Sequence, residues 1–273
     1  MAEHIVRILS DLHYLDRGGL EALSELTPLF EGVRHLILNG DTVETRHPKC
    51  APYVEDVLSF FKAAPLETTF ITGNHDPGLS PTLELSLAGG AVWITHGDIF
   101  WDCSAPWSRY APLMRRLIRE ERERMKLNED QSALPELLAA HRAAHIRSGT
   151  HYDPTQRQLH HRLYRLACIF FPPRQPYQMW RAWRHGAHLA RQWAQRHHPE
   201  ARFVLFGHMH YPGVWLPSSS SSGPVVINTG SFERPFGAFC VDVLPQRVQV
   251  RRIEKRGRQR HAGRILHDFP LAP

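Results

Sequence analysis

The feature that most constrains this chain is a pattern that occurs five times: a short apolar run stops at a small residue, and an Asp, Asn or His follows closely. The five segments read RILSDLH, LILNGDTVE, FITGNHDPG, VWITHGD and FVLFGHMH. Short apolar runs bounded by glycine favour buried β-strands, and the carboxyl ends of such strands gather along one edge of an open α/β sheet. The pattern therefore predicts an α/β fold with polar side chains assembled at that edge.

The rest of the first hundred residues fits this fold class, because apolar runs alternate with an amphipathic segment. We predict strands at residues 4–10, 35–40, 68–73 and 91–97. Residues 51–64 are predicted to form a helix that packs on the sheet through Val54, Val57, Leu58 and Phe61. Strands are predicted again in the segments RFVLFG, GVWL, PVVINTG, GAFCVDV and RVQVRRI.

Residues 105–199 differ in character, with long Arg-, His-, Ala- and Leu-rich segments that predict three or four helices. They carry 17 Lys and Arg against 7 Asp and Glu, a balance of 17 − 7 = +10, which leaves 6 − 10 = −4 for the remainder. We predict one core domain built from residues 1–104 and 200–273, with residues 105–199 inserted as a basic helical cap.

Composition excludes several classes of protein. The longest apolar runs fall far short of the twenty or so residues that span a bilayer, and the first residues lack the pattern of a signal peptide. The four cysteines are scattered without CxxC spacing, which argues against a thiolate zinc site or a disulfide framework. We expect a cytoplasmic protein, with peripheral contact to a membrane as an alternative.

The polar residues at the strand ends are the types that bind metals: Asp11, His13, Asp41, Asn74, His96, His208 and His210. Each taken alone has an ordinary explanation as a turn, a helix cap or a buried imidazole. Their coincidence at five strand ends favours a metal centre. Carboxylate, amide and imidazole donors without thiolate suit Mn²⁺, Fe, Zn²⁺ or Mg²⁺, and seven ligands indicate two ions that share a carboxylate.

The motifs DxH, GDxxE, GNHD, HGD and GHxH, in this order, resemble the calcineurin-like metallophosphoesterase family over residues 1–104 and about 200–244. The resemblance implies a four-layer αββα sandwich with two mixed β-sheets and an inserted helical cap. It also implies that Asp41 bridges two divalent ions, for which Mn²⁺ is our first expectation. One ion is then held by Asp11, His13, Asp41 and His210, and the other by Asp41, Asn74, His96 and His208.

The resemblance further implies a metal-dependent phosphoesterase in which a metal-bridging hydroxide attacks the phosphorus in line. His75 falls where the family has a histidine beside the substrate phosphate, a position from which it stabilises charge or protonates the leaving group. Asp76 is expected either to orient His75 as an acidic partner or to form a turn. An alternative without catalysis is a metal-binding scaffold.

The resemblance implies an anionic, phosphate-containing substrate, whose identity the sequence narrows only partly. GDTVETR and GNHD differ from the GDxVDRG and GNHE of protein phosphatases, and THGDIF lacks the double histidine of the cyclic-nucleotide branch. THGD followed by a helical insertion is similar to bacterial UDP-2,3-diacylglucosamine pyrophosphatases, although these commonly have GNRD, and NTGS is similar to the NPGS of small bacterial phosphodiesterases. We therefore expect a nucleotide-linked lipid or a small phosphodiester.

The insertion leaves several functions open because it combines arginines with many aromatic residues: Trp107, Tyr110, Phe170, Phe171, Tyr177, Trp180, Trp183 and Trp193. These rings could line a groove for an anionic amphiphile, contact anionic membrane lipid, or form the core of the insertion itself. A nuclease that tracks nucleic acid with the insertion and the tail RRIEKRGRQRHAGR is the alternative function. The oligomeric state is left open.

Overall fold

The computed structural model describes residues 4–271 except Arg17, residues 150–173, residues 218–222, Arg234 and Phe236. The predictions made for Phe170, Phe171 and the serine-rich loop at 218–222 lie outside the described residues. None of the helices in the described part of the chain combines the length and the apolar character needed to cross a membrane.

The first sheet has six strands in the order β11-β10-β9-β1-β2-β3. Their bounds are β1 (Ile5–Leu9), β2 (Val33–Asn39), β3 (Glu67–Ile71), β9 (Phe239–Leu244), β10 (Arg247–Arg256) and β11 (Gln259–Pro270). β1, β2 and β3 run parallel, whereas β9 pairs antiparallel with β1 and continues into the antiparallel strands β10 and β11. The sheet is therefore mixed.

The second sheet has five strands in the order β4-β5-β6-β8-β7. Their bounds are β4 (Glu84–Leu87), β5 (Val92–Thr95), β6 (Phe203–Phe206), β7 (Gly213–Trp215) and β8 (Val225–Asn228). β5, β6 and β8 are parallel, and the edge strands β4 and β7 are antiparallel to their neighbours. The central strands read VWIT and FVLF without polar alternation, as expected for strands that are covered on both faces.

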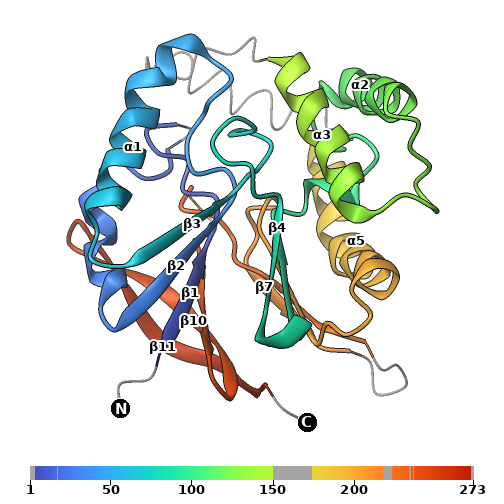
Figure 1. Cartoon of the computed structure of the whole chain (residues 1–273). Helices are drawn as coiled ribbons and strands as arrows, with labels where there is room; N and C mark the ends of the chain where they lie inside the picture. Colours follow the sequence, from blue (N-terminus) through green and yellow to red (C-terminus); the bar gives the residue numbers. More distant parts are fainter. Residues whose placement is uncertain are drawn as a thin grey trace.

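Helices flank both sheets (Figure 1). α1 (Ala51–Ala63) lies on the side of the first sheet, while α2 (Ala111–Arg124), α3 (Leu134–Ser148) and α5 (Arg174–His197) lie on the side of the second sheet. Short 3₁₀ helices complete the described elements: η1 (Leu23–Phe30), η2 (Pro48–Cys50), η3 (Ala88–Gly90) and η4 (Asp98–Phe100). The chain enters α2, α3 and α5 after β5 and returns to the sheet at β6.

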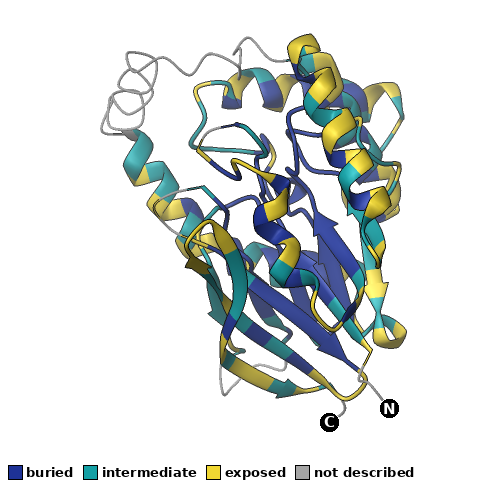
Figure 2. Ribbon diagram, turned by 90° about the vertical axis from the view of Figure 1, so that its left-hand side faces the viewer, coloured by how far each residue is buried: buried dark blue, intermediate teal, exposed yellow. Residues whose placement is uncertain are grey.

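Three apolar layers separate these elements. Ile8 of β1, Ile37 of β2 and Leu205 of β6 belong to the cluster between the two sheets. A second cluster joins η1 and α1 to the first sheet, and a third joins α3, α5 and η4 to the second sheet. The central strands, such as β5 and β6, are accordingly buried along their length, whereas β10 and β11 are largely half-buried or exposed (Figure 2). This arrangement confirms the predicted αββα sandwich with two mixed sheets.

Three local features differ from the sequence prediction. β4 and β11, both edge strands, were not predicted: β4 is short and alternates polar and apolar residues (ELSL), and β11 is largely polar, so neither has a continuous apolar run. The basic tail lies in the β10–β11 hairpin. Leu58 was predicted to pack on the sheet, but its side chain is 43% exposed, so the buried face of α1 is narrower and is formed by Val57 and Phe61.

Candidate metal centre

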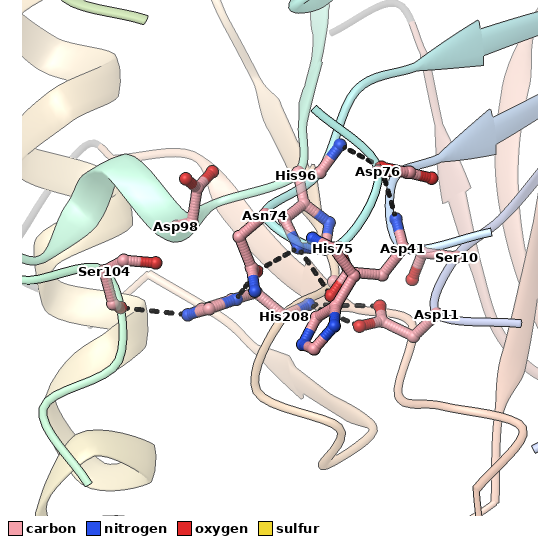
Figure 3. Close-up of polar contacts among 12 residues, drawn as sticks. Ser10, Asp11, Asp41, Asn74, His75, Asp76, His96, Asp98, Ser104 and His208 are labelled. Atoms are coloured by element: carbon pink, nitrogen blue, oxygen red, sulfur yellow. Dashed lines mark hydrogen bonds and ion pairs between the residues drawn. The ribbon is translucent and has the colours of Figure 1, made fainter. Parts of the chain in front are cut away.

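The strand ends of the two sheets meet at one place in the fold. β1 leads to Asp11 and His13, β2 to Asp41, and β6 to His208. Backbone hydrogen bonds join these loops, because Asp11 N–H donates to the carbonyl of Gly40 and His13 N–H donates to that of Asp41. Figure 3 shows the resulting group of side chains, most of which are buried. Parallel strands from both sheets thus deliver polar residues to a common centre.

The ligand atoms form two groups that share Asp41. The first group joins Asp11, His13, Asp41 and His210, and the second joins Asp41, His96 and His208; within each group the ligand atoms lie within 4.8 Å of one another. The amide oxygen of Asn74 lies 2.7 Å from His208 Nδ1 and 3.0 Å from His96 Nε2, so this residue belongs to the second group (Figure 3). The two groups together have the donor atoms to hold two divalent metal ions.

The histidines are oriented as metal-binding histidines are, with the opposite ring nitrogen held by another group. His210 Nδ1 lies 3.2 Å from Glu233 Oε2, His208 Nε2 lies 2.9 Å from the carbonyl of Ser104, and His96 Nδ1 lies 3.1 Å from the carbonyl of Asn39. The remaining nitrogens therefore point to the centre. The residues present fit two hard or borderline divalent cations.

The pKa shifts of the buried residues in this centre also favour a cation-binding site. Burial by itself raises the pKa of Asp41, but His96 and His75 outweigh this effect and hold it well below its ordinary value. Burial opposes the charged form of His210, yet Glu233 and Asp11 raise its pKa to about 10. His13 Nε2 and His210 Nε2 lie only 3.0 Å apart. The site thus packs buried carboxylates and facing imidazoles into a space that a cation would satisfy.

The backbone of the centre adopts the left-handed conformation at five of the seven predicted ligands. The φ angles are 53° at Asp11, 45° at His13, 53° at Asp41, 64° at His208 and 56° at His210. Residues other than glycine seldom adopt such angles, although Asp, Asn and His tolerate them best. Strained backbone of this kind concentrates at functional sites. The conformation turns each side chain out of its strand direction and toward the centre.

The small residues at the strand ends are required by close contacts. A Cβ atom at Gly40, whose φ is 79°, would collide with the ring of His96. A Cβ atom at Gly207 would collide with the carboxylate of Asp11 and the side chain of Ser10. The glycines in the sequence pattern therefore make room for ligands that arrive from neighbouring strands.

His75 lies beside the first group of ligands, with its ring centroid 5.2 Å from that of His13. Its Nδ1 atom is 2.9 Å from Glu44 Oε2 and 2.9 Å from the guanidinium of Arg46, which also binds Glu44. Burial opposes the charge on Glu44, but hydrogen bonds from Arg46 and His75 lower its pKa far below the ordinary value. Sequence reasoning assigned no role to Glu44, although it stands three residues after Asp41 in the same loop.

Asp76 makes the backbone hydrogen bonds expected if it forms a turn, the second of the two roles considered for it. Its carboxylate accepts hydrogen bonds from the backbone N–H groups of Gly73, Thr42 and Asp41 at 2.6, 2.7 and 3.2 Å. Burial and the nearby Asp41 raise its pKa to about 7. The carboxylate that reaches the ring of His75 is Glu44, and Asp76 instead braces the loop that carries Asp41.

Aromatic rings border the second group of ligands. The rings of Trp101 and Trp107 have centroids 5.6 and 5.4 Å from that of His208. Tyr211, which follows His210 in the chain, stacks on Trp183 of α5 at 4.9 Å. The dinuclear site is thus flanked by apolar surface that comes partly from the segment between β5 and β6.

An αββα sandwich whose strand ends hold two Asp/His groups around a shared carboxylate defines a metal-dependent phosphoesterase. Residues 6–212 match the family described as calcineurin-like phosphoesterase, and the chain belongs to this family. No match is found among the curated proteins.

The chain is similar to solved structures from several organisms. The chain is similar to a predicted phosphoesterase from Streptococcus pneumoniae TIGR4, with 16% identity, a TM-score of 0.41 and 99% of each chain covered. It is also similar to vacuolar protein sorting 29 from Cryptosporidium parvum, with 11% identity, a TM-score of 0.47 and coverage of 99% and 100%. A dimetal phosphatase from Danio rerio has 13% identity, a TM-score of 0.46 and full coverage of both chains. At such values, family membership rests on the family match.

Proposed function

We propose that the chain hydrolyses a phosphoester or pyrophosphate bond in a small anionic substrate by means of two divalent cations and His75. The observation that carries this proposal is the pair of ligand groups that share Asp41, with His75 directly beside them. One cation would be held by Asp11, His13, Asp41 and His210, and the other by Asp41, Asn74, His96 and His208. Mn²⁺ is the first choice, with Fe, Zn²⁺ and Mg²⁺ as alternatives.

Two cations in this site would neutralise charge on the phosphoryl oxygens and make water acidic enough to attack near neutral pH. His75 supplies the proton that the leaving oxygen needs. Because its Nδ1 can donate a hydrogen bond to Glu44 Oε2, its Nε2 is the atom that would meet the substrate. Asp76 contributes by fixing the backbone on either side of Asp41.

We further propose that residues 105–199 form a cap that selects the substrate. Arg142 on α3 donates a hydrogen bond of 2.6 Å to the carbonyl of Pro77, in the loop that carries His75. Trp107 lies against His208, as described above. A phosphate group bound at the metals would therefore have an aromatic wall next to it, which favours a substrate with an apolar or aromatic portion, such as a nucleotide-linked lipid or an aryl phosphodiester.

A nuclease activity has less support from the contacts of the basic residues in this segment. Arg115 pairs with Asp102, Arg122 with Glu129, and Arg147 with both Glu120 and Glu121. Arginines that are paired with carboxylates within the chain are weaker partners for a phosphate backbone. The same pairing reduces the charge that the segment offers to an anionic membrane.

The test is an activity screen on protein stripped of metal and reloaded with Mn²⁺, Fe²⁺, Zn²⁺ or Mg²⁺. We expect hydrolysis of bis-aryl phosphate and of a UDP-linked lipid, and none of single-stranded DNA at low salt. A Trp107→Ala variant should keep its metal content and raise the KM for both the lipid and the aryl substrate, whereas Tyr110→Ala serves as a control. Loaded protein that hydrolyses no phosphoester with any metal contradicts the proposal.

A further inference from the structure

A separate group of metal-binding side chains lies where α3 packs on η4. It consists of Asp98, His141 and His145, whose ligand atoms lie within 4.8 Å of one another. His141 and His145 are four residues apart on α3, so their side chains lie on the same face of the helix, one turn apart. Asp98 begins η4 and therefore comes from the loop that follows β5. The group belongs to none of the ligand sets of the dinuclear site.

The distances between these ligand atoms are suitable for binding one small cation. Asp98 Oδ2 lies 3.1 Å from His145 Nε2 and 4.0 Å from His141 Nδ1. Ligand atoms around a tetrahedral zinc ion, with bonds near 2.0 Å, are separated by about 3.3 Å. The two distances lie on either side of that value. All three residues are buried, with exposed fractions of 7%, 1% and 3% for Asp98, His141 and His145.

A second observation points to a ligand at this place. His141 Nδ1 is completely buried and has no hydrogen-bond partner among the described residues, although it faces Asp98. Buried polar atoms in proteins nearly always have a hydrogen-bond partner, and an exception calls for an ion, a water or a functional role to explain it. His141 Nδ1 is therefore aimed at a carboxylate that is too distant for a hydrogen bond but close enough to share a metal.

Metal binding at Nδ1 requires His141 Nε2 to give up its present contact with Arg122. His141 Nε2 lies 3.2 Å from a guanidinium nitrogen of Arg122, which can only donate. A metal at Nδ1 would place the ring proton on Nε2 and break this contact. Arg122 would remain anchored, because its other terminal nitrogen lies 2.6 Å from Glu129 Oε2.

We propose that Asp98, His141 and His145 bind a zinc ion that fastens α3 to η4. Two imidazoles and one carboxylate are a common zinc donor set, and the fourth position would be taken by water, since the Asp98 side chain remains 10% exposed. Bound there, the ion would link α3 to the loop that follows β5 and begins at His96.

The experiment must separate this ion from metals in the dinuclear site. A background variant with Asp41→Ala and His208→Ala removes ligands from both ligand groups of that site. After loading with zinc and dialysis, we expect elemental analysis to find one zinc per chain in this background. Adding His141→Gln and His145→Gln should remove it, whereas the exposed His185→Gln on α5 is the matched control and should keep it.

Spectroscopy and crystallography test independently whether unmodified Asp98, His141 and His145 bind a metal ion. With Co²⁺ in place of zinc, the background variant should show the intense visible absorption of a tetrahedral ion, and His141→Gln should abolish it. Crystals of the full chain grown with zinc should show anomalous density between Asp98 and His141. The proposal is overturned if a folded background variant holds no zinc, or if zinc-soaked crystals show no density there.

Discussion

The strand ends of the two sheets and the helices between η4 and β6 hold their polar residues in different ways. At the strand ends most of the side chains are buried, the backbone is fixed by strand pairing, and five predicted ligands adopt left-handed angles. On α2 and α3 the charged residues pair mainly with one another, as Arg147 does with Glu120 and Glu121. The comparison shows that sheet geometry sets the position of the reactive groups, whereas the helices provide surface that can change around them.

The largest effect in this comparison is expected at Asp41, which belongs to both ligand groups. Asp41→Asn keeps the shape of the side chain but removes the charge that two cations share. We expect kcat to fall by at least about 10³-fold, since metal ions contribute several kcal/mol to the stabilisation of transition-state charge. Steady-state kinetics and metal analysis measure the loss. The exposed Asp56→Asn on α1 is the control, and activity of Asp41→Asn within tenfold of wild type would contradict the site.

His75 should come next, because it acts on the substrate without holding metal. His75→Ala is expected to lower kcat by about 10²- to 10³-fold, the usual contribution of a general acid, while metal content stays unchanged. Glu44→Gln should cost about tenfold through loss of the carboxylate that orients His75, in the range known for groups that orient active-site histidines. Glu55→Gln, exposed on α1, is the matched control. Loss of metal in His75→Ala would assign this residue to the ligands instead.

The strand ends were predictable from sequence because local patterns determine them. Apolar runs located β1, β2, β5 and β6, and the residue types that follow each run selected side chains that the fold brings together. The role of Glu44 was not predictable, since only the folded loop shows which carboxylate, Glu44 or Asp76, reaches the ring of His75. β4 and β11 were missed because their pairing partners, and not their own hydrophobicity, make them strands.

A smaller effect is expected where the two regions touch. Arg142→Ala removes the hydrogen bond from α3 to the carbonyl of Pro77, so we expect the free energy of unfolding to fall by about 1 kcal/mol. Urea denaturation at constant metal concentration measures this change. Arg119→Ala, an exposed position on α2, should leave stability within about 0.5 kcal/mol of wild type. Equal stability of the two variants would show that this contact does not couple α3 to the core.

The smallest effect is on the pH dependence of stability. It is expected at His198, which precedes β6 of the second sheet. Burial opposes the charge on His198, but hydrogen bonds to Glu84 and Glu200 outweigh it and raise its pKa. A raised pKa stabilises the fold below the unfolded value of about 6.5, and this contribution is lost as pH rises through the folded value. His198→Gln should therefore destabilise the protein by a few tenths of a kcal/mol at pH 5.5 and less at pH 9. A larger loss at pH 9 would reverse the assignment.

The left-handed angles at the five predicted ligands lower the stability of the fold, although they direct the side chains toward the metal centre. Each such angle costs a non-glycine residue on the order of 1 kcal/mol, which glycine would not incur. Selection for a higher free energy of unfolding alone would therefore favour glycine at Asp11, Asp41 and His208. Only the need to bind cations would keep the present residues. If directed evolution selects for thermal stability without an activity screen, we expect these residues to be among the first that are replaced.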